Sequence, residues 1–333
     1  MKNLTCVQKA AYNLIQSDAR FLYTLTDIQN NANNIDSNYI MMCQPYIGIF
    51  TDGAEQWSKK VGLAAPTFNK KEKKYYGSLR QSHKLFEQSY TAYMQLLKEK
   101  FEESDYHFYS IRTLREKILG YYNVGTDICH AEFCGNTITT AMYMPINVFD
   151  KKDIGMWIKN ISIISGKLAD YFGCTKSPPY KYDDSIVVTY KDYHFYKNCP
   201  LKIKNEFGLL LFSIICSINY VTKFIDRYFV EEIPQKFKFA YLQYYYLCDF
   251  IEDLNLHNGT DFHIDDSMKN RELRNCFSHY GLGQYMSESD VLIDDILKGL
   301  TNKAFNMNYT EAKQQLYGFL YELSEQIKNY ILR

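Results

Sequence analysis

The stretch FGLLLFSIICSINYV, at residues 207–221, decides the fold class of this chain. It holds no charged side chain, and the apolar residues around it predict one buried helix over 203–229. A membrane-spanning helix needs about 20 apolar residues. This stretch is shorter, with Asn219 and Tyr220 near its end. We therefore expect a core helix in a soluble protein that has no membrane partner.

Downstream of this helix the sequence predicts a compact helical bundle. KFKFAYLQYYYLCDFIEDL (236–254) predicts an aromatic-rich helix, and after a polar loop a short helix begins near Lys269 and stops at Gly281 or Gly283. A last helix is expected over 309–331, because apolar residues recur there at helical spacing on one side. These residues are Leu316, Leu320, Leu323, Ile327 and Tyr330.

Helices also dominate the expectation for the first half. They are predicted over 4–28, about 83–103, 110–122 and about 151–172. Between the first two lies a polar stretch, 29–82, that contains Gly, Pro and a run of lysines, and we expect it to be irregular. Only seven prolines occur in 333 residues, which agrees with long uninterrupted helices.

The segment 173–200 divides the chain. It holds two adjacent prolines and the alternating sequence SIVVTYKDYHFY (185–196), which fits a small β-hairpin or a short edge strand. We therefore predict an all-α protein with two helical-bundle domains, 1–172 and 201–333, joined by this linker.

Composition narrows the class of protein. The chain has 38 Lys and Arg against 38 Asp and Glu, and 46% of its residues are hydrophobic, which excludes a disordered chain and a globally basic nucleic-acid coat. Nine cysteines, an odd number without a framework spacing, indicate reduced thiols in a cytoplasmic protein. Cys129 and Cys134 with His130 lack a second ligand pair, and no phosphate-binding glycine loop is present, so we expect no metal and no cofactor.

An internal repeat links the two halves. RTLREKILGY (112–121) aligns without gaps to RELRNCFSHY (271–280) and matches it at both arginines, the leucine and the final tyrosine. The same offset of 159 superposes the apolar stripe of 157–171 on that of the last helix. Either the N-terminal domain is a degenerate copy of the C-terminal one, or two amphipathic helices share their phase by chance.

The segment RELRNCFSHYG (271–281) carries the chemistry. At about 100° per residue, one face of this helix gathers two guanidinium groups, an amide, a hydroxyl and an imidazole, while the opposite face is apolar. The polar face consists of Arg271, Arg274, Asn275, Ser278 and His279, and the apolar face of Leu273, Cys276, Phe277 and Tyr280. Arginine forks bind phosphate, and an imidazole moves protons near neutral pH.

This polar face has the groups that metal-independent RNA cleavage needs. A base takes the proton of the ribose 2′-OH, the oxygen attacks the adjacent phosphorus, and cations stabilise the charge that develops. DNA lacks the 2′-OH, so the site is expected to select RNA, with Arg271 and Ser278 as supporting contacts. The alternative is structural: the histidine fills a helix interface, and the arginines lie on a solvated surface.

The residues Arg274-Asn275-x-x-x-His279 resemble the R-x(4)-H signature, with a polar residue after the arginine, of HEPN domains (higher eukaryotes and prokaryotes nucleotide-binding). The resemblance covers about 200–333. It implies a HEPN-like catalytic domain, an endoribonuclease in antiphage defence or a toxin system, and a site formed where two motifs face each other. It also implies that Arg274 binds the scissile phosphate, that His279 is the general acid/base and that Asn275 orients them.

The sequence departs from that pattern in two places. Gly120 and Glu116 stand where the repeat would place the histidine and the asparagine, so the first half lacks a catalytic imidazole, whereas Arg112 and Arg115 remain as candidate RNA contacts. Pairing of the two halves within one chain would give a site with one imidazole, and pairing of C-terminal domains between two chains would give a site with two. Of these alternatives we expect the homodimer through the C-terminal domain. Gly281 stands where some HEPN toxins carry the tyrosine that receives a nucleotide, which argues against that antitoxin chemistry and leaves another antitoxin or activating partner open.

Other features carry weaker signals. The basic-aromatic run at 70–76 fits an RNA-binding surface or a solvated loop. His257 and His263 flank the motif loop and either reach the site or serve as ordinary loop residues, while packing explains the tyrosines at 244–246. The rival hypothesis is a non-catalytic HEPN-like module, whose Arg/His face binds RNA, a nucleotide or a partner protein.

Overall fold

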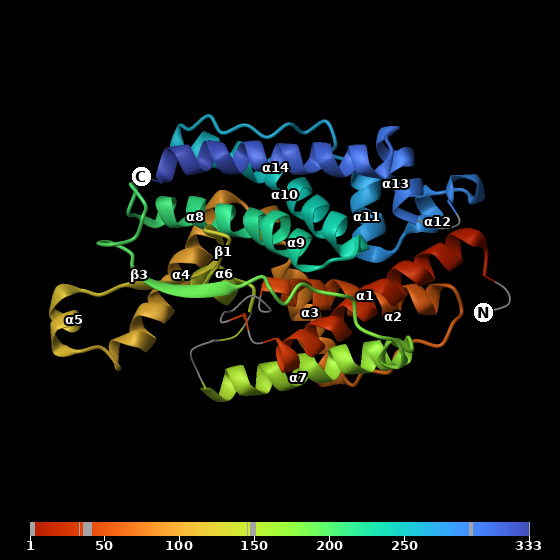
Figure 1. The fold of residues 1–333 in the computed structure, drawn as a ribbon, viewed down its shortest axis with the longest axis horizontal. Helices are drawn as coiled ribbons and strands as arrows, with labels where there is room; N and C mark the ends of the chain where they lie inside the picture. Colours follow the sequence, from red (N-terminus) through yellow and green to blue (C-terminus); the bar gives the residue numbers. More distant parts are fainter. Residues whose placement is uncertain are drawn as a thin grey trace.

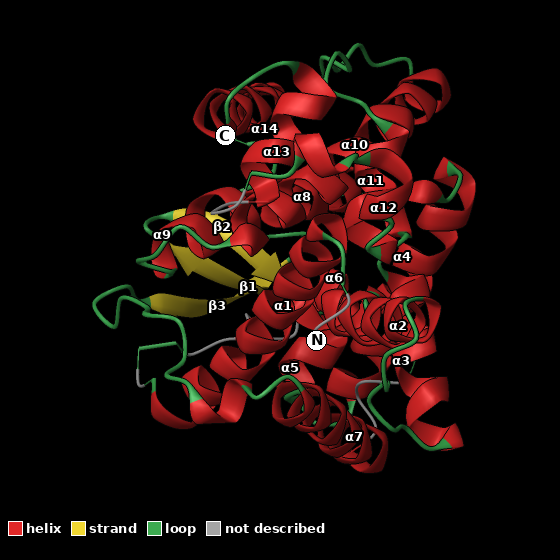
Figure 2. Ribbon diagram, turned by 90° about the vertical axis from the view of Figure 1, so that its right-hand side faces the viewer, coloured by secondary structure: helices red, strands yellow, loops and turns green. Residues whose placement is uncertain are grey.

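The computed structural model describes residues 4–32, 34–35, 42–144, 146, 151–292 and 296–332. Helices make up most of the protein, with one small sheet at its side (Figure 1, Figure 2). The prediction of an all-α fold with a small β element is confirmed. In the first half the helices are α1 (Cys6–Asn31), α2 (Gln44–Lys60), α3 (Lys70–Ser82), α4 (Tyr90–Tyr109), α5 (Leu114–Leu119), α6 (Thr137–Met142) and α7 (Lys151–Tyr171). In the second half they are α8 (Glu206–Asn219), α9 (Asp226–Tyr228), α10 (Pro234–Asn258), α11 (Arg271–His279), α12 (Leu282–Tyr285), α13 (Ile296–Phe305) and α14 (Tyr309–Ile331).

The predicted buried helix lies at the centre of the fold. α8 continues through a π-helical stretch, Tyr220–Ile225, into α9, and every residue of α8 from Gly208 on is buried. Among the described residues, Glu206–Tyr228 is the one helix long and apolar enough to cross a membrane, and 89% of its apolar window is buried inside the protein. Neighbouring elements, including α14 and β2, cover it. This burial is typical of a core helix in a soluble protein.

The sheet differs from the predicted hairpin. β1 (Asn123–Cys129) lies between β2 (Glu132–Asn136) and β3 (Val188–His194), and it pairs antiparallel with both. The segment 185–196 therefore supplies a single strand, and the hairpin is formed by β1 and β2, which the sequence did not reveal. A side chain at Gly125 would collide with the ring of Tyr190 on β3, so glycine makes room for that ring against β1.

The stretch predicted to be irregular, 29–82, contains two helices instead. α3 has a complete capping box, in which Asn69 and Glu72 each accept the other's backbone N–H. A β-carbon at Gly48 of α2 would overlap the backbone of α3 near Arg80, so the two helices pack at close range. The prediction for this stretch was wrong because its glycines allow close packing and do not interrupt helices.

The two halves share one hydrophobic core, to which residues from Val7 to Ile331 contribute. α1 packs on α10 and α12, and α2 packs on α11. The two segments matched by the internal repeat are packed differently, because α5 buries none of its residues whereas α11 buries its apolar face. The domain boundary and the duplication stay predictions.

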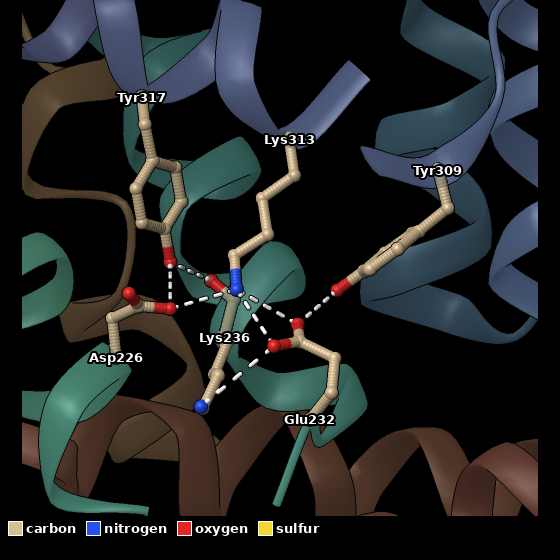
Figure 3. Close-up of polar contacts among 6 residues, drawn as sticks. All are labelled: Asp226, Glu232, Lys236, Tyr309, Lys313 and Tyr317. Carbon is tan, nitrogen blue, oxygen red and sulfur yellow. Dashed lines mark hydrogen bonds and ion pairs between the residues drawn. The ribbon is translucent and has the colours of Figure 1, made fainter. Parts of the chain in front are cut away.

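A network of charged and phenolic groups fastens the connection between α9 and α10 to α14 (Figure 3). Its members are Asp226, Glu232, Lys236, Tyr309, Lys313 and Tyr317. Lys313 Nζ lies 2.7 Å from Asp226 Oδ1 and 2.8 Å from Glu232 Oε1, so one ammonium group neutralises two carboxylates. The hydroxyl of Tyr309 donates to Glu232 at 2.5 Å. The network thus holds α14 against the start of α10, the helix on which α11 also packs.

Candidate functional site

The start of α11 is held by local capping and by two tyrosines of α10. Asn270 is the N-cap, and its side chain accepts the N–H of Leu273 at 3.0 Å. The hydroxyl of Tyr241 lies 3.0 Å from the carbonyl oxygens of Met268 and Asn270. The hydroxyl of Tyr244 donates to the carbonyl of Asp265 at 2.7 Å. These contacts fix the loop before α11 and therefore the direction of the helix.

The end of α11 is held by Tyr280 rather than by the glycines that follow. Tyr280 takes the left-handed conformation, with φ of 51°, and its ring is buried against α2 at Gly53. Its hydroxyl donates to the buried carboxylate of Asp18 on α1. Gly283, predicted as a stop signal, lies inside α12. His279 is thus the last residue of a helix whose end is anchored in the core.

His279 is exposed, and its imidazole contacts the N-terminal half of the chain. Nη2 of Arg80, on α3, lies 3.0 Å from Nδ1 of His279, and Nη1 of Arg80 pairs with Asp52 of α2. A guanidinium group has only donors, so Nδ1 must accept this hydrogen bond. The neutral imidazole therefore carries its proton on Nε2 in this arrangement.

The surroundings of His279 lower the pKa of its imidazole. Although the residue is exposed, neighbouring groups partly desolvate the ring, and the positive charges of Arg80, Arg274 and Lys84 act in the same direction. Asp52 opposes this shift. At neutral pH the imidazole can donate from Nε2 but cannot accept there until its tautomer changes.

Arg274, the motif arginine, lies at the edge of an aromatic pocket. Its guanidinium carbon is 5.3 Å from the ring centroid of Tyr245 and 6.0 Å from that of Tyr246. Together with residues of the 86–89 segment, these side chains line a cavity of about 280 Å³. Tyr245 is half-buried and Tyr246 is buried, and the carboxylates of Glu87, Asp249 and Asp253 line the same cavity. A phosphate here would therefore depend on the guanidinium fork for its binding.

The other residues of the 271–281 segment differ in their exposure to solvent. The apolar residues Leu273, Cys276 and Phe277 are buried, as the helix periodicity predicts. Arg271 is exposed and Asn275 is half-buried, so both reach the surface. Ser278 is only 7% exposed, and its hydroxyl has no hydrogen-bond partner among the described residues. The structure therefore does not bring Ser278 to the exposed face.

The two arginines predicted in the first half lie far from this site. α5, which carries Arg115, lies at the end of the molecule opposite to α11 (Figure 1). Arg112, just before α5, pairs with Asp105 at 2.6 Å and reaches Asn123 at 3.5 Å. Its side chain is only 5% exposed. The fold thus separates Arg112 and Arg115 from Arg274 and gives Arg112 a structural partner.

The basic-aromatic run at 70–76 forms part of α3 and packs against its neighbours. Lys73 and the buried Tyr76 both contact Glu55 of α2. The ring centroid of Tyr75 lies 5.1 Å from that of Trp157. Lys73, Tyr75 and Tyr76 therefore contact neighbouring helices, which supports a structural role for these three side chains.

The two histidines beside the motif loop have local partners. His257 stacks on Tyr90, with 4.9 Å between ring centroids. The backbone N–H of His263 donates to the side-chain oxygen of Gln326 on α14, and the side-chain amide of Gln326 donates to the carbonyl of His263. These contacts assign both residues to the packing of the loop.

Sequence patterns did not reveal the residues that α2 and α3 contribute to the site, namely Asp52, Arg80 and the nearby Lys84. Arg80 is 199 positions from His279 in the chain. Its segment carries no motif, and α3 itself was not expected. No local signal identifies this partner.

Comparison of the chain with protein-family models, curated proteins and solved structures found no match. Within the described residues, no three or more His, Cys, Asp or Glu side chains are grouped so as to hold a metal ion. A function for this chain must therefore be inferred from the side chains of the site.

Proposed function

We propose that this chain is a HEPN-like, metal-independent endoribonuclease whose active site contains Arg274 and His279. The observation that carries the proposal is an exposed imidazole that hydrogen-bonds to the guanidinium group of Arg80 and lies within the electrostatic influence of Arg274. The R-x(4)-H spacing supports the same assignment. Asn275, half-buried on the same helix, orients the two motif residues.

Cleavage proceeds by attack of the ribose 2′-oxygen on the adjacent phosphorus. The new bond between the 2′-oxygen and phosphorus forms as the bond to the 5′-oxygen breaks, which leaves a 2′,3′-cyclic phosphate and a 5′-hydroxyl. One imidazole takes the 2′-OH proton, and a protonated group supplies one to the leaving oxygen. The guanidinium groups stabilise the charge on the phosphoryl oxygens. A second His279, from a partner copy in a homodimer, supplies the complementary acid or base.

The test is cleavage of a mixed-sequence single-stranded RNA in EDTA by the wild type, His279→Ala and Arg274→Ala. We expect products with cyclic phosphate ends from the wild type only, with rates at least about 100-fold lower in both variants. Arg227→Ala, an exposed arginine of α9, serves as the matched control and should cleave normally. Equal cleavage by the wild type and His279→Ala would contradict the proposal.

A second candidate function is RNA binding without cleavage. It is favoured by one observation: the contact with Arg80 leaves a proton on Nε2 of His279, so the exposed nitrogen is a donor and not a base. In a binding module, His279→Ala lowers affinity for RNA, and the wild type yields no cyclic phosphate ends. In the enzyme, the same variant keeps its affinity within a few fold and loses cleavage.

The cellular setting follows from the resemblance alone. A cytoplasmic ribonuclease in antiphage defence or a toxin system needs an antitoxin or an activating partner to restrain it. Expression of the wild type should then arrest growth, and expression of His279→Ala should not. Normal growth with wild-type protein that is active in the RNA assay would contradict the toxin role.

A further inference from the structure

The cationic groups near His279 come from both halves of the chain. Arg80 comes from α3 and Arg274 from α11, and both guanidinium groups act on His279. The charged groups that face the imidazole are Asp52 of α2, Arg80, Lys84 after α3, and Arg274. Lys84 also pairs with Glu87. Carboxylates also surround these three cations: Asp52 and Glu87, and, in the cavity beside Arg274, Asp249 and Asp253. A phosphate would therefore be recognised by the donors of the two guanidinium groups and not by the net charge of the surface.

Arg80 is suited to change partners. Its Nη1 is held by Asp52, while its Nη2 donates to a neutral nitrogen of His279. A hydrogen bond to a phosphate oxygen is stronger than one to a neutral acceptor, because donor and acceptor are both charged. The side chain is 29% exposed, so an incoming phosphate can reach it.

We propose that one phosphate of bound RNA is held between Arg80 and Arg274, and that this phosphate draws Nη2 of Arg80 away from His279. The inference rests on the proposed function for its ligand, a phosphodiester of RNA. It assigns Arg80 two tasks, as a phosphate contact and as a positioning residue that sets the tautomer of His279.

The proton balance of the imidazole follows from this exchange. In the free protein Nδ1 accepts from Arg80 and Nε2 bears the proton. When the guanidinium turns to the phosphate, Nδ1 is released, and the ring can carry its proton on Nδ1 and present Nε2 as a base. The negative charge of the phosphate also favours the protonated ring, so the pKa of His279 rises when RNA is bound. The catalytic base is therefore formed only on the bound substrate.

The test uses ¹⁵N NMR of the His279 ring nitrogens, assigned with His279→Gln, between pH 5 and 8. The probe is a short 2′-O-methyl RNA, which has the phosphates but no attacking hydroxyl. In the free wild type we expect Nδ1 unprotonated and Nε2 protonated at neutral pH. In Arg80→Ala this preference is lost and the pKa of His279 is higher. With the probe bound, the wild-type tautomer and pKa move toward those of the variant.

Affinity for the same probe supplies the second measurement. Arg80→Ala should weaken binding by about 10- to 100-fold, as the loss of one charge-assisted hydrogen bond implies. Arg80→Lys should recover part of the affinity without restoring the tautomer, because an ammonium group lacks the planar fork. Arg227→Ala is the control, and α9 lies away from α11 in Figure 2. A thermal melt of each variant confirms that it folds.

The outcomes separate this inference from the proposed function. If the ring nitrogens of His279 are the same in the wild type and Arg80→Ala, or if the probe leaves them unchanged, the inference is wrong even when RNA is cleaved. If the NMR and affinity changes occur but the wild type never cleaves RNA, the phosphate site stands and the ribonuclease assignment fails.

Discussion

Asp18 Oδ2 lies 2.6 Å from Lys238 Nζ, and both side chains are completely buried. The hydroxyl of Tyr280 donates to the same carboxylate, and Gln235 Nε2 donates to its other oxygen at 2.8 Å. α1, α10 and the residue that follows the motif histidine are therefore joined by one ion pair in the core. The hydrogen bond of Tyr280 attaches the end of α11 to this pair.

Breaking this ion pair from one side should destabilise the protein strongly. Lys238→Met leaves the Asp18 carboxylate buried without its cation, so we expect a loss of about 3–5 kcal/mol in the free energy of unfolding. The double variant Asp18→Leu with Lys238→Met removes both charges and should regain part of that loss. Urea denaturation measures both, with the exposed Lys60→Met as control. A double variant less stable than Lys238→Met would show that the unpaired charge is not the cause.

Gly53 on α2 makes room for the ring of Tyr280. A β-carbon at this position would lie 2.5 Å from Cε2 of Tyr280, so Gly53→Ala should cost about 1–3 kcal/mol through overpacking. Gly166→Ala in α7 is the matched control, because its β-carbon would meet no atom within 4 Å. There the gain in helix propensity should stabilise the protein by about 0.5–1 kcal/mol. Opposite signs in thermal denaturation support the packing argument, and equal signs contradict it.

His83 should make stability depend on pH. Its ring packs between Tyr46 and Tyr246, and burial, with the positive charges of Lys84 and Lys238, lowers its pKa to about 3. The unfolded chain binds a proton at His83 below about pH 6.5 while the folded protein does not, so the free energy of unfolding falls as pH falls from about 6.5 toward 3.

Chemical denaturation at several pH values tests this linkage. Between pH 6.5 and 5, His83 alone contributes a loss of about 2 kcal/mol. His83→Gln should show a slope smaller by about one proton in that range and the same slope above pH 7, where the imidazole is neutral in both states. An unchanged slope below pH 6.5 would mean that His83 is protonated in the folded protein.

Arg112 and Arg115 should affect stability and RNA binding differently from Arg274. Arg112→Ala removes the partner of Asp105 and should cost about 1–3 kcal/mol, whereas the exposed Arg115→Ala should change stability by less than about 0.5 kcal/mol. Because α5 lies at the opposite end of the protein from α11, neither should produce the loss of RNA affinity that the proposed function predicts for Arg274→Ala. A comparable loss of affinity in Arg115→Ala would extend the RNA surface to α5.

The helices that sequence patterns predicted well are those with a strong local signal. The apolar run ending near Tyr220 and the stripe from Leu316 to Ile327 were placed correctly, because burial of one face or of the whole helix follows directly from the spacing of these residues. Tyr330, expected on the same stripe, is 44% exposed. α2 gave no such signal, since it is buried on almost every side and has no solvated stripe. Its glycines, Gly48 and Gly53, suggested interruptions but lie at close contacts with α3 and Tyr280.

The sheet and the partner of His279 were not predicted, for different reasons. The hairpin of β1 and β2 is local, but its turn residues, His130 and Ala131, have positive φ without the glycine or asparagine that usually marks such a turn. The pairing of β1 with β3 and the contact of Arg80 with His279 join segments far apart in the chain, in the second case across 199 positions. A single sequence places residues on one helix face, and only the fold shows which other helix supplies a neighbour.

The burial of α8 has a consequence for the synthesis of this protein. α14, which covers one side of α8, begins about 80 residues after the continuous helix ends at Tyr228. At about 5–20 residues per second, the ribosome completes the start of α14 roughly 4–16 s later. For that interval a segment long and apolar enough to cross a membrane lacks its final partner. We therefore expect the speed of translation between α9 and α14 to influence the yield of folded protein.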